Sequence, residues 1–241
     1  MLRGLSPYGL NGFATFAPAL KIVLKNEGGY ANKPLDKGGE TYRGIARNFH
    51  GYWQGWIIID FYKSRFGAIP EGAYITELMP EYSHIDTDLV PDFYASLWQK
   101  SRAGEIASQA VANLYFDFFV HSQNAVSVVQ QTLNSFGHKL AVDNAIGPNT
   151  LAAINATDAN ELHDAIKQNR IGYIDQLVKN GSLDPSFYEG IQKRIAGFPQ
   201  FTTDRGTNKA LVVFFLFATA GAALLLRENL GQKLKNKDYE K

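Results

Sequence analysis

The chain has 241 residues, of which 45% are apolar and 13% aromatic, and its formal net charge is +1. This length and composition predict a folded protein with one large domain or two small ones, and they exclude an intrinsically disordered chain. The balanced charge gives no broad basic surface, so no nucleic-acid partner is expected. The chain has no cysteine, which excludes disulfides and thiolate metal sites.

The first predicted element is an amphipathic helix over residues 12–27. Its apolar side chains recur at helical spacing, at Phe13, Phe16, Leu20, Val23 and Leu24. The two glycines that follow Glu27 are expected to end it, with Gly28 or Gly29 in the left-handed C-cap conformation. Residues 30–45 are rich in turn-forming side chains and predict a small β-hairpin.

The rest of the chain reads as mostly helical. Residues 51–65 fit either a strand or a helix, and residues 66–90 look irregular. Asp117 falls inside an almost wholly apolar helix, where it needs a polar partner, so we interpret it as structural rather than catalytic. The expected fold is mainly α, or α+β, with the small hairpin after the first helix. Further helices are expected over 91–100, 106–121, 125–136, 148–154, 158–179 and 187–196.

Residues 210–226 form a run without charges, flanked by Lys209 and Arg227. As a helix the run would span roughly 25 Å, slightly less than a ~30 Å hydrocarbon core. Snorkelling by the flanking cations could make up the difference, so we predict a transmembrane helix that anchors the chain in a membrane. A buried core helix is the alternative. Residues 201–209 then form a hinge and residues 227–241 a charged tail.

The side of the membrane stays open. The tail after Arg227 is basic, which favours a cytoplasmic tail and an enzyme outside. However, Pro7, Asn11 and Pro18 interrupt the apolar N-terminal stretch, so no secretory signal is expected there. A tail-anchored protein held inside the cell is the second possibility.

Glu27 is the first candidate for chemistry. Cleavage of a glycosidic bond needs a proton donor near the leaving oxygen, and a carboxylic acid can serve if its surroundings favour the protonated form. The C-terminal end of a helix acts in that direction, because its dipole disfavours added negative charge. A glutamate before a glycine at a helix end is also common for purely structural reasons.

Asp36 and Thr41 follow within the hairpin. Two carboxylates on either side of the scissile bond are the usual apparatus of glycosidases. A hairpin folded back on the helix end could bring Asp36 across a cleft from Glu27, where it would stabilise a cationic transition state or orient a water. Thr41 could position that water. The structural alternatives are a turn-forming aspartate and a β-edge threonine.

Several other side chains close to this stretch in sequence are candidates for sugar binding. Aromatic rings pack against the C–H faces of sugars, and amides bind their hydroxyl groups. The candidates are Tyr30, Asn32, Trp53 and Trp56, although most aromatic side chains serve a core. The five histidines show no metal spacing, and neither a metal nor a cofactor is expected.

The stretch from Glu27 to Ile45 resembles the signature of glycoside hydrolase family 108, which comprises bacterial and phage N-acetylmuramidases. The resemblance implies a lysozyme-like domain over 9–122 in which Glu27 is catalytic, and the order of Glu27, Asp36 and Thr41 is similar to that in phage lysozymes. The threonine comes one residue later in those proteins. The matching positions are Glu27-Gly-Gly-Tyr30, Asn32, Pro34, Asp36, Gly38-Gly-Glu-Thr41 and Gly44-Ile45.

A second segment resembles the peptidoglycan-binding module that accompanies the family, which implies a helical module over 123–200. Together the resemblances imply a peptidoglycan hydrolase that cleaves the β-1,4 bond after N-acetylmuramic acid, with glycan strands as its partner, and the run 210–226 adds the expected membrane anchor. The rival is a membrane-tethered wall-binding protein or secretion helper without catalysis. The marks of the module are Gln130, Leu133-Asn134, Gly137, Leu140, Val142-Asp143, Ile146-Gly-Pro148 and Thr150.

Overall fold

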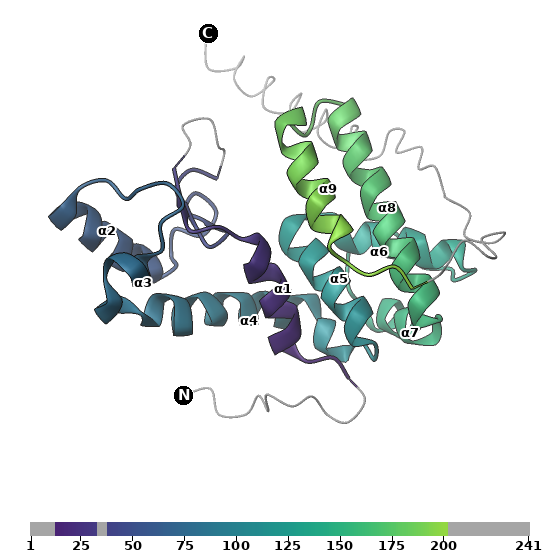
Figure 1. The fold of residues 1–241 in the computed structure, drawn as a ribbon. Coiled ribbons are helices and arrows are strands. Elements are labelled where there is room, and N and C mark those ends of the chain that lie inside the picture. Colours follow the sequence, from purple (N-terminus) through teal and green to yellow (C-terminus); the bar gives the residue numbers. More distant parts are fainter. Residues whose placement is uncertain (1–12, 33–37, 202–241) are drawn as a thin grey trace, which may run out of the picture.

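The structure is a computed structural model that describes residues 13–32 and 38–201. In its first part, one helix precedes a small sheet and several helices follow the sheet. Figure 1 shows α1 between the lobe that holds α2 and α3 and the bundle of later helices. The elements are α1 (Phe16–Asn26), β1 (Tyr30–Ala31), β2 (Thr41–Tyr42), β3 (Ile45–Ala46), α2 (Gly55–Phe66), α3 (Ile75–Leu78), a π-helical segment (Ile85–Leu89), α4 (Val90–Ser101) and α5 (Gln109–His121).

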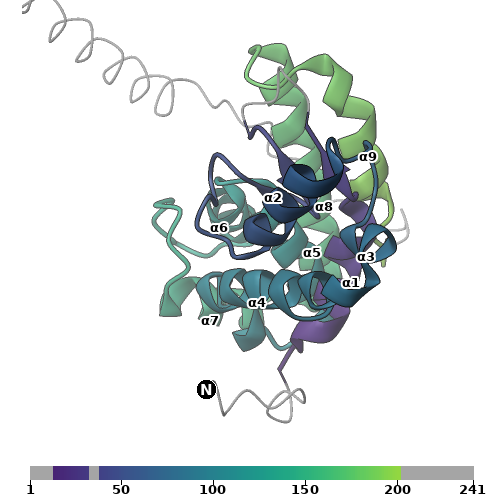
Figure 2. The same ribbon diagram turned by 90° about the vertical axis from the view of Figure 1, so that its left-hand side faces the viewer.

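The second part of the described chain is helical. Pro148 opens α7, where a missing N–H is tolerated, and the Asp158 carboxylate caps α8 by accepting from two backbone N–H groups. In Figure 2, α8 and α9 extend away from α4 and α7. The elements are α6 (Ala125–Ser135), α7 (Pro148–Ala156), α8 (Ala159–Lys179) and α9 (Tyr188–Ala196).

The three strands form one antiparallel sheet in the order β1-β2-β3. Tyr42 pairs with Tyr30 on one side and with Ile45 on the other. Arg43 and Gly44 connect β2 to β3 and both have positive φ, 51° and 77°. This is the pattern of a two-residue type I′ hairpin turn, in which a non-glycine residue such as Arg43 is strained.

Helix α5 lies at the centre of the core. It packs on α1, α4, α6 and α8, and Leu114, Tyr115 and Phe116 on it are fully buried. Its start is capped by Ser108, whose side chain accepts from the Val111 N–H. One hydrophobic cluster contains α1 and α4 side chains together with Leu162 and Ile166 of α8. The earlier and later helices therefore share a core.

The predicted fold class is confirmed as mainly helical with a small antiparallel sheet. The later helices appear with small shifts at their ends, and the ambiguous stretch 51–65 is helical as α2. The segment 66–90 is less irregular than predicted. It contains α3 and the π-helical segment, and the side chains of Ile75 and Ile85 at their starts are buried in the core.

The prediction of a left-handed glycine after α1 is wrong. Glu27 is the C-cap, in extended conformation, and neither Gly28 nor Gly29 has positive φ. Gly29 is needed for another reason: a Cβ there would overlap the carbonyl oxygens of Gly72 and Ala73. The backbone passes this close because the Tyr30 N–H donates to Ala73 at 2.8 Å.

No helix within residues 13–32 and 38–201 is long and apolar enough to cross a membrane. The predicted transmembrane helix, residues 210–226, lies outside these ranges, as do the tail 227–241 and the hinge beyond residue 201.

Candidate active site

Glu27 lies where α1 ends and the chain turns into β1. Its backbone N–H still donates to the Val23 carbonyl, so the residue closes the last turn of the helix. Its side chain is 18% exposed. The helix end therefore fixes the base of the side chain and leaves part of the carboxylate at the surface.

The turn between β2 and β3 covers one face of this carboxylate. A Cβ on Gly44 would lie 2.5 Å from Glu27 Oε2 and 2.7 Å from the Tyr94 hydroxyl oxygen. The turn is held in place by Tyr94, whose hydroxyl donates to the Arg43 carbonyl at 2.7 Å. Glycine is thus required at position 44 both by its φ and by the closeness of the carboxylate.

The other side of the carboxylate meets an arginine from the second part of the chain. Arg194 of α9 donates from Nη1 to Glu27 Oε1 at 2.8 Å. Its Nε donates to Asp117 of α5 at 2.9 Å, and Asp117 also accepts from Arg170 of α8 at 2.8 Å. The interpretation of Asp117 as a structural residue with a partner agrees with this ion-pair chain.

The chain of ion pairs is almost closed to solvent. Asp117 and Arg170 have fully buried side chains, and Arg194 is 10% exposed. Burial alone would raise the pKa of Asp117, but the guanidinium groups of Arg170 and Arg194 outweigh it and lower that pKa. Burial alone would lower the pKa of Arg194, but the nearby carboxylates of Asp117 and Glu27 outweigh burial and raise that pKa. Burial and the nearby Glu27 raise the pKa of Tyr94, which keeps its hydroxyl neutral.

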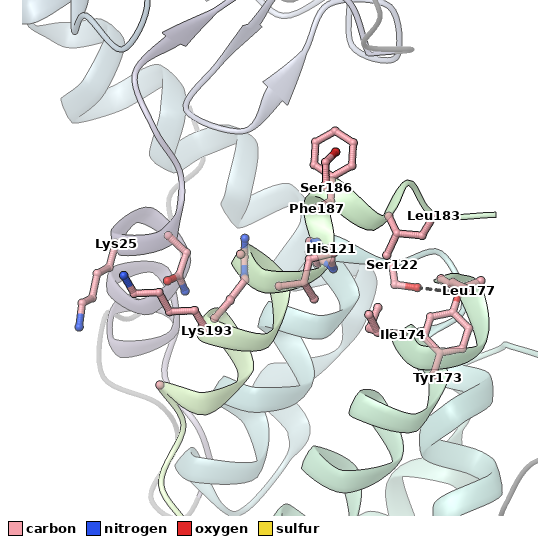
Figure 3. Close-up of a pocket in the computed structure, with 15 residues that line it drawn as sticks. Lys25, His121, Ser122, Tyr173, Ile174, Leu177, Leu183, Ser186, Phe187 and Lys193 are labelled. Carbon is pink, nitrogen blue, oxygen red and sulfur yellow. Dashed lines mark hydrogen bonds between the residues drawn. The ribbon is translucent and has the colours of Figure 1, made fainter. Parts of the chain in front are cut away.

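A groove of about 940 Å³ lies close to Glu27, which is not itself one of its lining residues. Its lining includes Asn26, the residue before Glu27, and Arg194, its ion-pair partner. Figure 3 shows Lys25 and Lys193 at one end and Tyr173, Leu177 and Leu183 at the other. Within residues 13–32 and 38–201, no group of three or more His, Asp or Glu side chains could hold a metal ion.

The models of two known protein families match this chain. The model of the family Glycosyl hydrolase 108 matches residues 20–122, which include most of α1, the sheet and Asp117. Residues 20–122 belong to glycosyl hydrolase family 108. The model described as "Predicted Peptidoglycan domain" matches residues 124–196, which carry Arg170 and Arg194. A glycosyl hydrolase domain joined to a peptidoglycan domain gives the protein a role in peptidoglycan hydrolysis, with peptidoglycan as a partner.

A solved structure titled "Structure of Brucella abortus SagA" is similar to this chain. The two are 23% identical, with a TM-score of 0.48, and the match covers 76% of this chain and 94% of that one. No curated protein matches the chain.

Three of the aromatic side chains predicted to bind sugar lie in the core of the glycosyl hydrolase 108 domain. Trp53 and Trp56 are 7% and 3% exposed, and their ring N–H groups donate to the Leu89 and His50 carbonyls. Tyr30 is 5% exposed and donates its hydroxyl to Glu40. These three rings are therefore mostly covered by the core, and their part in sugar binding stays a prediction.

Of the other predicted site residues, the structure describes Asn32 and Thr41 but not Asp36. Asn32 is exposed at the end of β1, and its backbone N–H donates to Glu71 at 3.3 Å. Thr41 begins β2, is half-buried and donates its hydroxyl to the Gly39 carbonyl at 3.2 Å. Asp36 lies outside the described residues, so its position relative to Glu27 stays a prediction.

Sequence reasoning missed Arg194 and the role of Gly44. The need of Asp117 for a partner was visible in the sequence, but several arginines could have met it. Glu27 and Arg194 are separated by 167 positions, and no local pattern joins them. Gly44 was recognised only as part of a motif, because its contact with the carboxylate depends on how the hairpin folds back.

Proposed function

We propose that this protein is an N-acetylmuramidase. It hydrolyses the β-1,4 bond between N-acetylmuramic acid and N-acetylglucosamine, and Glu27 donates the proton to the leaving oxygen. The observation that carries the proposal is the position of this carboxylate. It is the glutamate of the family motif, it is partly exposed between a helix end and a glycine turn, and its neighbour Asn26 and its partner Arg194 line a large groove.

The ion pair with Arg194 has to be part of the mechanism. An arginine beside a carboxylate favours the charged form, whereas a general acid must carry a proton when substrate is bound. Arg194 contacts Asp117 through Nε and Nη2 and contacts Glu27 through Nη1. The proposal therefore requires Nη1 to leave Glu27 in the substrate complex, while the Asp117 contacts keep the arginine in place.

Asp36 and Thr41 are the proposed helpers. A second carboxylate would either stabilise the cationic transition state directly or act on the attacking water, and the separation of the two carboxyl groups distinguishes these cases. Thr41 would orient that water, with its hydroxyl oxygen as acceptor. Replacement of Asp36 by Asn tests its part, and we expect a loss of activity with unchanged stability.

The decisive experiment compares the full-length protein in detergent with its Glu27→Gln variant on purified cell walls. Glutamine can still accept the hydrogen bond from Arg194, so the fold should be kept, while a proton donor typically contributes about 10²–10⁴-fold to the rate. Clearing of turbidity measures the rate. Reduction of the products with borohydride, followed by mass spectrometry, should give reduced N-acetylmuramic acid, which identifies the bond. Equal clearing by both proteins would remove Glu27 from the mechanism.

One observation favours a second candidate function. The Glu27–Arg194 pair joins the two domains, and that is also what a purely structural glutamate would do. In that case the protein binds the wall, or helps secretion through it, without cleaving glycan. It would sediment with insoluble walls, and neither the wild type nor Glu27→Gln would release reducing ends.

We further propose that residues 210–226 anchor the protein in a membrane, on the basis of their sequence. Extraction of membranes with alkaline carbonate should leave the full chain in the pellet. A chain that ends before Lys209 should be released into the supernatant. Labelling of a cysteine introduced at Ser6 in intact cells would then give the side of the membrane.

A further inference from the structure

The groove beside Glu27 has two unlike ends. Lys25 and Lys193 lie at one end, and Leu177 and Leu183 lie at the other (Figure 3), while Arg194 and Phe187 also line the groove. No aspartate or glutamate is among its lining residues in the described part of the chain. A ligand that fits both ends carries negative charge on one portion and small apolar groups on another.

Two of the cations that line the groove are available to a ligand. Lys25 and Lys193 are exposed, and neither forms an ion pair among the residues that the structure describes. Arg194 is held by Asp117 and Glu27. Phe187, which also lines the groove, is 53% exposed, so its side chain can contact a ligand.

The groove is built by both domains. Lys25 closes α1 of the glycosyl hydrolase domain, whereas Lys193 and Arg194 come from α9 of the peptidoglycan domain. Its volume, about 940 Å³, is at the upper end of the range for sites that enclose small ligands. A ligand seated there would touch both domains and would lie next to the carboxylate that is proposed to protonate the scissile bond.

We propose that this groove binds the peptide stem of peptidoglycan, and this inference rests on the proposed function. The stem is an oligopeptide attached to the lactyl group of N-acetylmuramic acid, and it carries free carboxylates and alanine methyl groups. If the bond after that sugar is cleaved at Glu27, the stem leaves the glycan strand close to Lys25 and Lys193. Its carboxylates would meet the cationic end and its methyl groups the apolar end.

The same contact would act on Glu27. A stem carboxylate near Arg194 offers Nη1 a second acceptor, and Asp117 keeps the rest of the guanidinium in place. The arginine would then pass from Glu27 to the substrate, which leaves the Glu27 carboxyl group free to hold a proton. Binding of a glycan that carries peptide stems would in this way free Glu27 to act as the general acid.

The test uses the full-length protein in detergent and a soluble stem tetrapeptide of alanine, glutamate, diaminopimelate and alanine. Isothermal titration calorimetry measures its affinity for the wild type and for Lys25→Glu and Lys193→Glu. We expect each charge reversal to weaken binding ~10-fold or more. Lys139→Glu is the matched control, because Lys139 is exposed and lies outside the groove, and its affinity should equal that of the wild type.

The outcomes separate this inference from the proposed function. No binding of the tetrapeptide, or equal binding by the wild type and both groove variants, overturns the inference. It is also overturned if the groove variants lose binding to vesicles with anionic phospholipid but not to the tetrapeptide. The proposed function is judged independently, by Glu27→Gln on cell walls, so either claim can fail while the other stands.

Discussion

Glu40 and Glu27 both belong to the glycosyl hydrolase motif, and their surroundings differ. Glu40, just before β2, is 8% exposed and is enclosed by the Tyr30 hydroxyl, Arg47 and Lys63. All of these partners come from the sheet lobe and α2. Glu27 is more exposed, and in the described part of the chain its ion-pair partner is Arg194 of the other domain.

The difference separates a carboxylate that builds the fold from one that can change its partner. Burial and the nearby Glu40 raise the pKa of Tyr30, so that hydroxyl remains a donor to Glu40 at all ordinary pH values. Loss of any one of these contacts leaves Glu40 with others. Arg194 has Asp117 as a second acceptor, so it can leave Glu27 without losing all of its charge compensation.

The largest effect is expected at the buried end of the interdomain ion pairs. Asp117→Asn leaves the fully buried Arg170 without a countercharge and should destabilise the protein by about 3–5 kcal/mol. Thermal unfolding followed by circular dichroism measures the loss. A loss smaller than that of Glu40→Gln would contradict the view that this chain of ion pairs joins the two domains.

Asp117 also predicts a pH dependence. Its pKa is lowered in the folded state, so its contribution to stability is fully present above its ordinary pKa of 3.8 and is lost as the pH falls through the lower value. The wild-type melting temperature should therefore fall below about pH 3.8 more steeply than that of Asp117→Asn. Parallel curves would mean that another carboxylate dominates.

Glu40→Gln should have an intermediate effect. The neutral amide weakens the contacts with Arg47 and Lys63, which costs about 1–3 kcal/mol of stability. The enzyme that remains folded should clear cell walls at the wild-type rate. Glu27→Gln should show the reverse, with little change in melting temperature and loss of activity. If both substitutions had the same pattern, the distinction between the two glutamates would fail.

The sequence predicted the helices well because their signals are local. Apolar residues at helical spacing are read within a few positions, and the structure confirms the helices that they predict, including those that begin at Pro148 and next to Asp158. The stretch 51–65 stayed ambiguous because Ile57 to Ile59 fit two periodicities, and packing of Trp56 and Ile59 into the core decided it.

The candidate site depends on contacts that no local pattern contains. The motif pointed to Glu27, but its ion pair comes from Arg194, far along the chain. Trp53 and Trp56 were candidates for sugar binding because they follow the motif in sequence. The fold turns their rings inward, where they pack edge-to-face at 5.2 Å. Burial, rather than residue type, therefore distinguishes a core tryptophan from one that stacks on sugar.

The last prediction concerns Gly44, whose replacement should reduce activity less than Glu27→Gln does. Alanine at φ 77° costs about 1–2 kcal/mol in backbone strain. Gly137→Ala is a matched control, because Gly137 has φ 97° and nothing within 4 Å of its added Cβ. The melting temperature should fall in both variants, and it should fall further at position 44, where the added Cβ also meets the Glu27 carboxylate and the Tyr94 hydroxyl. At position 44 the methyl group must also displace the Glu27 carboxylate, so we expect wall hydrolysis to fall on the order of tenfold in that variant alone. Equal hydrolysis by both would show that the position of this carboxylate does not matter for the reaction, and Glu27 would then belong with Glu40 as a residue of the fold.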